Sequence, residues 1–435
     1  MKVLSFNAYY TPEFAASLFL EEDIAEGFAK AGLENEMYVP TPSRGVSDEV
    51  REEYKSKKEE LFFDNKLRVI RYDLMKEGKN PILRALRYFI QNYKQYKCGT
   101  HAKDIDAIFC GSTPPTQGLM AGYVKKKLCK KYKKYVPFVY NLQDVFPDSL
   151  VGTGLAKKNS LLWKIGRKVE DKTYKNADKI IVISQDFKRN IMAKGVPEEK
   201  IEVIYNWVDE NAITPVKDEE NELFEEFGIS REKFRVVYAG NLGHAQNIEI
   251  IVEAAQRLKE KGNIEFVIFG TGGLEDDIKA TKVKEQLDNL KILPLQPYER
   301  VAKVYGLGNV CIVACKPGLG GAAMPSKTWS IMSSGRAVLA NFDEGELKEI
   351  LEGGSAFRPF DPAQGPQAQE PQPCGVFTKA GDLEGFVDAI KELSQQPERC
   401  AEMGRNGRQF ILDNLTREVG TRKYVEVIRQ VAGNG

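Results

Sequence analysis

Histidine is scarce in this chain of 435 residues, which contains only His101 and His244. Its seven cysteines are scattered and form no Cys-x-x-Cys pair. Because no cluster of His, Cys or carboxylate residues has the spacing of metal ligands, we expect no metal site. An odd number of unpatterned cysteines also favours reduced thiols in a cytoplasmic protein over a disulfide framework.

Long apolar runs are missing as well. No stretch of about eighteen apolar residues occurs, so no transmembrane helix is predicted. The opening residues, MKVLSFNAYYTPEF, are apolar only briefly and lack the pattern of a signal peptide. An apolar fraction of 42% and a charged fraction of 29% are typical of a soluble globular enzyme. A chain of this length favours two or three domains.

Net charge is small, but the value of +1 conceals an uneven distribution. Residues 1–199 carry 35 Lys and Arg against 26 Asp and Glu, and the remaining residues carry 28 against 36. A basic first half and an acidic second half indicate two domains with different partners.

Short β-branched runs alternate with amphipathic stretches through the whole chain. Strands are predicted at residues 2–6, 36–39, 67–71, 107–110, 138–141, 179–183, 202–204, 235–239, 265–269, 291–293, 310–314, 337–340 and 375–377. Strands that alternate with helices indicate βαβ units, and therefore an α/β fold of two doubly wound parallel-sheet domains. Ligands are expected at the carboxyl ends of the strands.

Composition divides the chain further. Residues 1–206 form the first predicted domain, the polar stretch 207–233 a linker, residues 234–405 the second domain, and residues 406–435 a C-terminal helix. Within the second domain, residues 355–374 are rich in Pro and Gln and contain little that can pack in a core. We interpret them as a disordered or extended surface insertion.

A glycine-rich loop precedes a short predicted helix in the segment KPGLGGAAMPSK, residues 316–327. Backbone N–H groups of such a loop can approach an anion closely. Lys327 lies in the first helical turn, where the helix dipole disfavours a cation, so its position makes sense if a phosphate binds beside it. Taken alone, the pattern also fits an ordinary tight loop.

Four segments occur in a fixed order: residues 183–213, 236–258, 316–340 and NGRQFILDNLTR, residues 406–417. Together they resemble family 4 of the retaining GT-B glycosyltransferases, and most of all the subgroup that builds bacterial surface polysaccharides, such as the N-acetylfucosamine transferases. The resemblance implies an acceptor-side first domain and a donor-binding second domain that face a central cleft. It also implies a final helix that returns to the first domain, and a reaction without metal or cofactor.

The resemblance assigns donor-side roles residue by residue. The implied nucleotide-sugar contacts are Gly240, Asn241, Gly243, Gly270, Gly272, Leu295, Gln296, Gly320, Gly321, Ser326, Lys327 and Ser330. Lys327 would be the main cation on the diphosphate. The sequence departs from the family where Ala322 and Ser330 replace its glutamate pair, and where Asn241 and Gln246 replace a basic pair.

Polar residues follow two predicted strands of the first domain. Thr11 and Glu13 follow the first strand, and Gln143, Asp144 and Asp148 follow the strand at 138–141. A carboxylate such as Asp144 could orient an acceptor hydroxyl or accept its proton. Capping of a neighbouring helix or turn is the alternative for these side chains.

A run of lysines fills the predicted helix around residues 117–132. Its members include Lys125, Lys126, Lys127, Lys130 and Lys131. A solvated helix face is the simple interpretation, and no nucleic-acid-binding motif accompanies the run. An anionic membrane fits better, because each basic residue near such a surface contributes about 1 kcal/mol. We therefore expect a cytoplasmic protein bound peripherally at the inner face of the cell membrane.

These features predict transfer of a hexose or N-acetylhexosamine, with retention, from a nucleotide-sugar, in our prediction a UDP-sugar. The expected acceptor is a membrane-associated, lipid-linked polysaccharide precursor. A nucleotide-sugar epimerase of similar fold is one alternative, although the chain offers few histidines for acid–base steps. A catalytically silent partner subunit is another, because the glutamate pair is missing.

Overall fold

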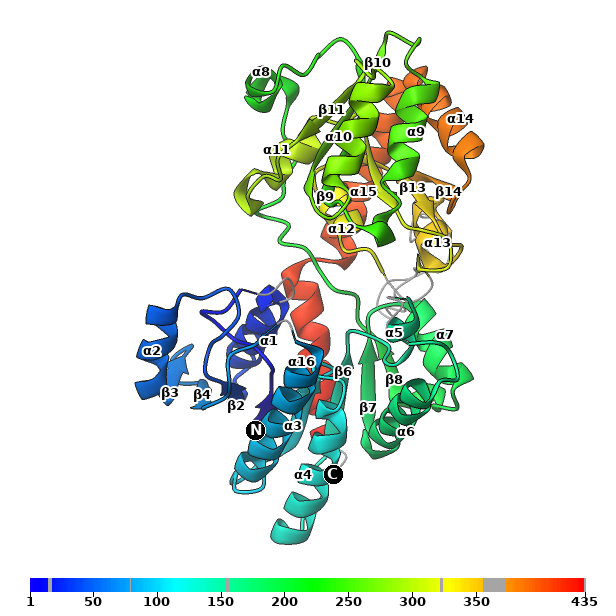
Figure 1. The fold of residues 1–435 in the computed structure, drawn as a ribbon. Helices are drawn as coiled ribbons and strands as arrows, with labels where there is room; N and C mark the ends of the chain where they lie inside the picture. Colours follow the sequence, from blue (N-terminus) through cyan, green and yellow to red (C-terminus); the bar gives the residue numbers. More distant parts are fainter. Residues whose placement is uncertain (15–17, 79, 153–155, 321–323, 355–371, 434–435) are drawn as a thin grey trace. The chain divides into compact units, whose positions relative to one another are not determined.

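A computed structural model describes residues 1–435 except 15–17, 79, 153–155, 321–323, 355–371 and 434–435. The chain forms two compact units, one of Met1–Asn206 with Glu418–Gly435 and the other of Trp207–Arg417 (Figure 1). Each unit contains one sheet covered by helices. The α/β class with two parallel-sheet domains, predicted from the alternation of strands and helices, is confirmed.

The sheet of the first unit has eight strands in the order β3-β4-β2-β1-β5-β6-β7-β8. They are β1 (Lys2–Phe6), β2 (Glu34–Pro40), β3 (Glu59–Phe62), β4 (Leu67–Tyr72), β5 (Ala107–Gly111), β6 (Phe138–Leu142), β7 (Lys179–Val182) and β8 (Ile201–Val203). All neighbours are parallel except β3, which pairs with β4 in antiparallel fashion. The sequence analysis missed this edge strand because two glutamates begin it and none of its residues is fully buried.

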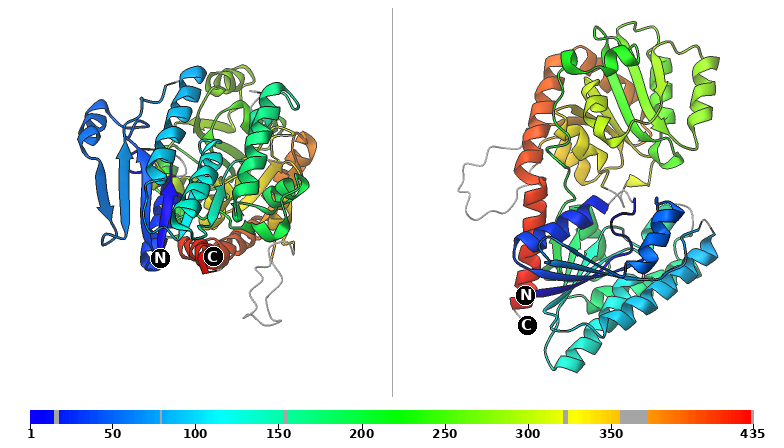
Figure 2. Two further views of the ribbon diagram at one scale, coloured as in Figure 1. Left: turned by 90° about the horizontal axis from the view of Figure 1, so that it is seen from below. Right: turned by 90° about the vertical axis from the view of Figure 1, so that its left-hand side faces the viewer.

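Helices cover both faces of this sheet. They are α1 (Leu18–Lys30), α2 (Asp48–Ser56), α3 (Pro81–Gly99), α4 (Gln117–Tyr132), α5 (Asp148–Gly152), α6 (Leu161–Asn176), α7 (Gln185–Ala193) and α16 (Arg417–Gly433). Phe109 of β5 packs edge-on against Phe28 of α1 and Tyr424 of α16, with ring centroids 5.7 and 5.9 Å apart. Successive strand residues face opposite sides of a sheet. The neighbouring Ile108 and Cys110 therefore join the core under α3 and α4, on the face opposite α16 (Figure 2).

The second unit contains six parallel strands in the order β11-β10-β9-β12-β13-β14. They are β9 (Phe234–Asn241), β10 (Ile264–Thr271), β11 (Leu290–Leu293), β12 (Val310–Ala314), β13 (Ala337–Phe342) and β14 (Gly375–Lys379). The helices are α8 (Leu223–Glu226), α9 (Glu249–Arg257), α10 (Glu275–Lys284), α11 (Val301–Gly306), α12 (Lys327–Ser333), α13 (Glu346–Leu351), α14 (Leu383–Ser394) and α15 (Pro397–Asn414). Its central strands are almost wholly buried, as expected of parallel strands covered on both faces.

Two predicted segment assignments need correction. The stretch 207–233 is not a free linker, because Ile213, Leu223 and Phe224 are buried within the second unit. The charged residues around them obscured this short apolar signal. The C-terminal segment is not one returning helix from residue 406: α15 belongs to the second unit, and only α16 belongs to the first.

The predicted insertion at 355–374 falls mostly on residues 355–371, which lie outside the described residues. Its last residue is an exception, because Cys374 is 1% exposed and its N–H donates to the carbonyl of Leu351. Cys374 directly precedes β14. It therefore belongs to the folded second unit and not to a surface insertion.

Candidate functional site

Glycines allow β9 and β10 to run side by side to their carboxyl ends in the second unit. Gly240 pairs with Gly270 in the strand register. A Cβ atom on Gly270 would stand 2.3 Å from the Gly240 carbonyl oxygen, and Gly240 itself has a positive φ of 144°. Residues with a Cβ atom are therefore disfavoured at the positions of Gly240 and Gly270. The result is an edge of bare backbone at the point of the sheet where α/β proteins bind ligands.

Lys327 points at this edge. It is the first residue of α12, and its Nζ lies 4.1 Å from the centroid of the Tyr238 ring. The same Nζ is 2.9 Å from the place that a Cβ atom on Gly240 would occupy. Among the described residues, no carboxylate forms an ion pair with this half-buried ammonium group. Burial lowers the pKa of Lys327 to about 8, as expected of a cation that lacks a counter-ion.

The two neutral residues that replace the family's basic pair lie together. The Asn241 Nδ2 atom donates to Gln246 Oε1 over 3.3 Å. Both side chains lie close to Gly243, since a Cβ there would stand 2.6 Å from Asn241 Nδ2 and 2.8 Å from Gln246 Oε1. A Cβ on Gly272 would stand 2.8 Å from Asn241 Oδ1. The structure thus gathers five predicted glycine and asparagine contacts around one strand edge.

The glycine-rich loop before α12 differs from the prediction. The N–H groups of Gly318 and Gly320 donate to the Asp343 carboxylate, at 3.0 and 2.8 Å. A Cβ on Gly320 would also collide with the Phe342 ring at 2.6 Å. Gly320 is therefore explained by local packing, and an anion at this loop would have to displace Asp343. Gly321 lies outside the described residues.

The remaining donor-side candidates are spread out. Leu295 is 50% exposed beyond β11, and the Gln296 side chain accepts a hydrogen bond of 2.8 Å from Arg300. Ser326 is exposed and forms no side-chain cap on α12, and Ser330 lies one turn further along. Ser326 and Ser330 share the α12 segment with Lys327, but no side-chain hydrogen bond among the described residues joins any of the four to Lys327, so their roles stay predictions.

Glu13, predicted on the acceptor side, is a structural clamp. It is 4% exposed, and its Oε1 accepts hydrogen bonds from the N–H groups of Ser43 and Arg44 at 2.8 and 3.1 Å. Burial raises the pKa of this carboxyl, while the backbone donors oppose the rise. The residue ties the loop after β1 to the loop after β2. Thr11 also acts through its backbone, because its carbonyl oxygen accepts from Arg71.

Asp148 is also occupied by partners within its own unit. Its carboxylate pairs with Lys194 at 2.8 Å and accepts from Trp163 Nε1 and Asn190 Nδ2, each at 3.3 Å. Burial would raise the pKa of Asp148, but Lys194 outweighs it and the pKa is lowered. The residue joins α5 to α6 and α7, which gives it a structural role, and its acceptor-side role stays a prediction.

Gln143 belongs to an amide network below the end of β6. Its Nε2 donates to Asn141 Oδ1 at 3.0 Å, and its Oε1 accepts from Asn206 Nδ2 at 2.8 Å. The Tyr424 hydroxyl donates to the same Asn141 oxygen at 3.0 Å. Gln143 therefore links the end of β6 to Asn206 at the end of the first unit, and its acceptor-side role stays a prediction.

Asp144 is the predicted acceptor-side residue that stays at the surface. The surrounding protein raises the pKa of its carboxyl, and a hydrogen bond with the Ser149 side chain opposes that rise. An exposed carboxylate at a strand end can still meet a ligand, so its role stays a prediction.

A pair that the sequence analysis missed lies at the ends of β1 and β5. Glu21 of α1 accepts a hydrogen bond of 3.0 Å from Nδ2 of Asn7, which directly follows β1. Burial raises the pKa of this carboxyl to about 7, and the Asn7 hydrogen bond opposes the rise. Glu21 belongs to the acidic run Glu21-Glu22-Asp23. Such a run is common in the solvent-exposed first turn of a helix, so nothing in the sequence marked Glu21 as a buried residue.

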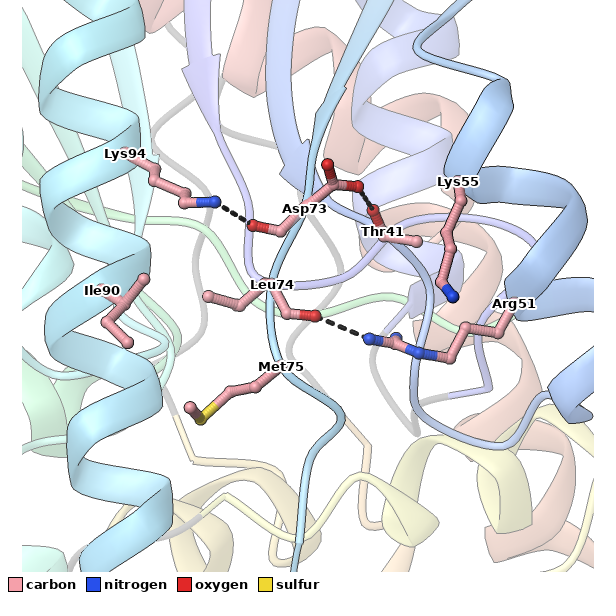
Figure 3. Close-up of a pocket in the computed structure, with 8 residues that line it drawn as sticks. All are labelled: Thr41, Arg51, Lys55, Asp73, Leu74, Met75, Ile90 and Lys94. Atoms are coloured by element: carbon pink, nitrogen blue, oxygen red, sulfur yellow. Dashed lines mark hydrogen bonds between the residues drawn. The ribbon is translucent and has the colours of Figure 1, made fainter.

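A cavity of about 460 Å³ opens in the first unit beside the loop after β4 (Figure 3). Its lining is Thr41, Arg51, Lys55, Asp73, Leu74, Met75, Ile90 and Lys94. The Arg51 guanidinium donates hydrogen bonds of 2.6 Å to the backbone carbonyl oxygens of Pro42 and Leu74. Within the described chain, neither Arg51 nor Lys94 has a carboxylate partner. The cavity therefore presents three basic side chains and one carboxylate, that of Asp73, beside apolar side chains.

The predicted lysine surface is smaller than expected. Lys125 is not free, because its Nζ lies 2.6 Å from Asp178 and its side chain is 13% exposed. The contact could not be seen in the sequence, since the two residues lie 53 positions apart. Lys126, Lys127, Lys130 and Lys131 are exposed along α4.

An apolar surface accompanies these lysines on the neighbouring helices. Eight large apolar residues on these helices are each between 46% and 79% exposed. They are Ile82, Leu83, Leu86, Phe89 and Tyr93 on α3, and Leu161, Leu162 and Ile165 on α6. Both helices pack against α4, so the three lie in one layer. A patch of this size usually marks a binding surface.

The part of the chain that the structure describes contains no group of three or more His, Cys, Asp or Glu side chains arranged to hold a metal ion. In the same residues no helix is both long and apolar enough to cross a bilayer. Metal independence stays a prediction.

Comparison with known proteins identifies the family. The description "Glycosyltransferase Family 4" matches residues 22–212, and "Glycosyl transferases group 1" matches residues 219–410. The chain belongs to the GT-B glycosyltransferases of family 4.

Relatives of this family 4 protein support the assignment. The probable glycosyltransferase WbjE of Pseudomonas aeruginosa is 27% identical over 364 residues, which cover 81% of this chain and 82% of WbjE. Anabaena HepE, solved in complex with UDP-glucose, matches with a TM-score of 0.67 at 14% identity, covering 99% and 100% of the two chains. WaaG, a glycosyltransferase of lipopolysaccharide biosynthesis, matches with a TM-score of 0.61 at 12% identity, covering 98% and 99%. The surface-polysaccharide subgroup stays a prediction.

Proposed function

We propose that this glycosyltransferase moves a hexose or N-acetylhexosamine, with retention, from a UDP-sugar to a lipid-linked polysaccharide precursor. The observation that carries the proposal is the unpaired Lys327 ammonium aimed at the bare backbone of Gly240. A buried cation without a counter-ion is unfavourable unless a ligand supplies the negative charge. That the structural relative HepE was solved with UDP-glucose supports a donor of this class.

The proposed chemistry follows from charge. As the bond between the sugar and the diphosphate breaks, negative charge grows on the diphosphate, and Lys327 would stabilise it more strongly in the transition state than in the ground state. Asn241 and Gln246 would add neutral hydrogen-bond donors. The leaving diphosphate would take the acceptor proton, without metal or cofactor, and Asp144 would orient the acceptor.

The acceptor would be an anionic amphiphile at the cytoplasmic face of the cell membrane. Three features of the first unit support this part: the cavity with Arg51 and Lys94, the exposed apolar side chains of α3, and the lysines of α4. Ile90 and Lys94 line the cavity, and Leu83 and Leu86 continue the same side of α3 one to two turns earlier. If the phosphate of this amphiphile bound in the cavity, its hydrocarbon chain would lie against the apolar side chains of α3.

Incubation of the purified protein with a panel of UDP- and GDP-sugars tests the donor side. Slow hydrolysis of one donor, with release of the nucleotide diphosphate, is expected of a transferase without its acceptor. Interconversion of two sugars would instead identify an epimerase. A protein that binds and consumes no nucleotide-sugar would be the silent partner subunit. NMR of the product anomer formed with an acceptor then tests retention.

A further inference from the structure

The order of strands in the first unit reverses between β1 and β5. Loops from the two strands separate there, and α/β proteins bind ligands in the resulting crevice. Asn7 follows β1 at this point, Gly111 ends β5, and Glu21 lies in the first turn of α1. One Glu21 oxygen, Oε2, accepts from Asn7 Nδ2 at 3.0 Å, and a Cβ atom on Gly111 would stand 3.7 Å from the other, Oε1.

Asn7 carries an unused acceptor at the same place. The residue is 4% exposed, its N–H donates to the Tyr38 carbonyl at 3.3 Å, and its carbonyl accepts from Gln95 Nε2 at 3.1 Å. Its side-chain oxygen Oδ1 has no hydrogen-bond partner within the described chain. A buried acceptor without a donor costs free energy. It is consistent with a donor group that the described residues do not supply.

Among the described residues, no Lys, Arg or His side chain forms a salt bridge with Glu21. Tyr10, Cys110 of β5 and Tyr424 of α16 are its titratable neighbours, and burial raises the pKa of all three above their ordinary values. All three are therefore neutral at pH 7. With no cation to hold it ionised, the Glu21 carboxyl, whose pKa is about 7, can exchange its proton near neutral pH.

We infer that the crevice between β1 and β5 binds the sugar end of the acceptor, with ionised Glu21 accepting a hydrogen bond from the hydroxyl to be glycosylated and Asn7 Oδ1 accepting one from a neighbouring hydroxyl. The inference deepens the proposed function and rests on it. The basic cavity follows β2 and β4, on the same edge of the sheet. In this strand order, about two strand spacings, on the order of 10 Å along the sheet edge, separate the two places, within reach of a sugar phosphate.

The substitution Glu21→Gln tests the site with little change of shape. Transfer from UDP-glucose, or from the donor found active, to octyl glycosides of glucose, galactose and N-acetylglucosamine is the assay. Losing a hydrogen bond to a charged group should lower kcat/KM for the acceptor about tenfold or more. UDP affinity and donor hydrolysis should stay at wild-type values. Glu26→Gln on the same helix is the matched control, because it removes the same charge five residues further along α1, where the Glu26 carboxylate lies 2.9 Å from Lys30 Nζ, and it should not affect transfer.

The pH dependence of kcat/KM for the acceptor distinguishes a Glu21 that contacts the acceptor from a Glu21 that only supports the fold. In the wild type, kcat/KM for the acceptor should rise as pH passes through about 7, and this limb should vanish in Glu21→Gln. Transfer by Glu21→Gln at the wild-type rate, or an unchanged limb, would overturn the inference and leave the proposed function standing. An equal loss of UDP affinity would overturn it too. A wild type that neither binds UDP nor consumes any donor would overturn the proposed function and this inference together.

A second readout needs no substrate. Because the folded-state pKa of Glu21 is raised, its protonated form stabilises the fold below the ordinary carboxyl pKa, and that stability is lost as pH rises through about 7. Thermal unfolding of Glu21→Gln should therefore lack this part of the wild-type decline, whereas Glu26→Gln should retain it. Identical pH dependence in Glu21→Gln and wild type would overturn the assignment of the carboxyl.

Discussion

In the proposed function the donor chemistry depends on Lys327, because Asn241 and Gln246, which replace the family's basic pair, are neutral. Losing a preorganised donor to a developing charge typically costs on the order of 3–4 kcal/mol. Lys327→Ala should therefore lower turnover by roughly a hundredfold or more while the fold stays intact. Lys327→Arg should restore only part of the activity, because a planar guanidinium does not occupy the place of a compact ammonium group. Steady-state kinetics with circular dichroism checks this, and near wild-type turnover in Lys327→Ala would contradict the phosphate assignment.

The same residue predicts a pH effect on donor binding. With a pKa of about 8 in the unliganded protein, the ammonium group loses its proton as pH rises through 8. UDP affinity should fall above that pH in the wild type, and Lys327→Arg should show no such fall because arginine stays charged. Titration calorimetry between pH 6.5 and about 9.5 measures both. The same affinity at both ends of the range in the wild type would be evidence against an ammonium–diphosphate contact.

Lys327 also has a cost for folding. Its lowered pKa means that the cation is less favourable in the folded protein than in the unfolded chain, and this penalty is fully present below pH 8 and disappears above the ordinary lysine pKa. Lys327→Met should thus be no less stable than the wild type at pH 7, even though its cation–π contact with Tyr238 is lost. Thermal unfolding at pH 7 checks this. A clearly lower Tm would mean that Lys327 supports the fold.

At the scale of elements, helices α3 and α6 supply the surface expected to meet the membrane. Replacing Ile82 and Phe89 with Ser should weaken binding to anionic vesicles by removing apolar area, at about 25 cal/mol per Å². Replacing Lys126, Lys127, Lys130 and Lys131 with Gln should weaken it through charge, and high salt should mimic that change. Vesicle sedimentation is the measurement.

The matched control for this surface is Val283→Ser. Val283 is 77% exposed on α10 of the second unit, which carries none of the residues of the proposed surface, so its replacement should leave vesicle binding unchanged. If the apolar and lysine variants both sediment with vesicles as the wild type does, the membrane proposal is wrong. Donor hydrolysis should stay intact in all of them.

At the scale of the whole molecule, α16 makes the last segment of the chain part of the first unit. Tyr424 is 1% exposed, packs on Phe109 and bonds Asn141. Tyr424→Ala should cost the first unit about 3–5 kcal/mol, and Tyr424→Phe about 1 kcal/mol. Hydrogen exchange measured by mass spectrometry should show faster exchange in β5 and β6 and unchanged exchange in β9 and β10. Uniform exchange changes in both units would mean that the units do not unfold separately.

The sequence by itself determined most of the strands among the described residues. β-branched runs predicted thirteen of the fourteen strands, because a buried parallel strand is encoded locally by its own residues. Local sequence also placed Lys327 at the start of its helix, beside glycines. The exception, β3, is an edge strand whose residues are half exposed.

Only the tertiary structure decided which polar residues are free. Glu13 finds its partners at Ser43 and Arg44, and Asp148 finds Lys194, all tens of residues away. Glu21 looks like any solvated acidic residue until α1 places it between the ends of β1 and β5. The sequence gives the type of each side chain and its spacing from the others. Whether its charge is paired or left for a ligand depends on distant segments that meet only in the fold, and that pairing sets both the pKa and the chemistry.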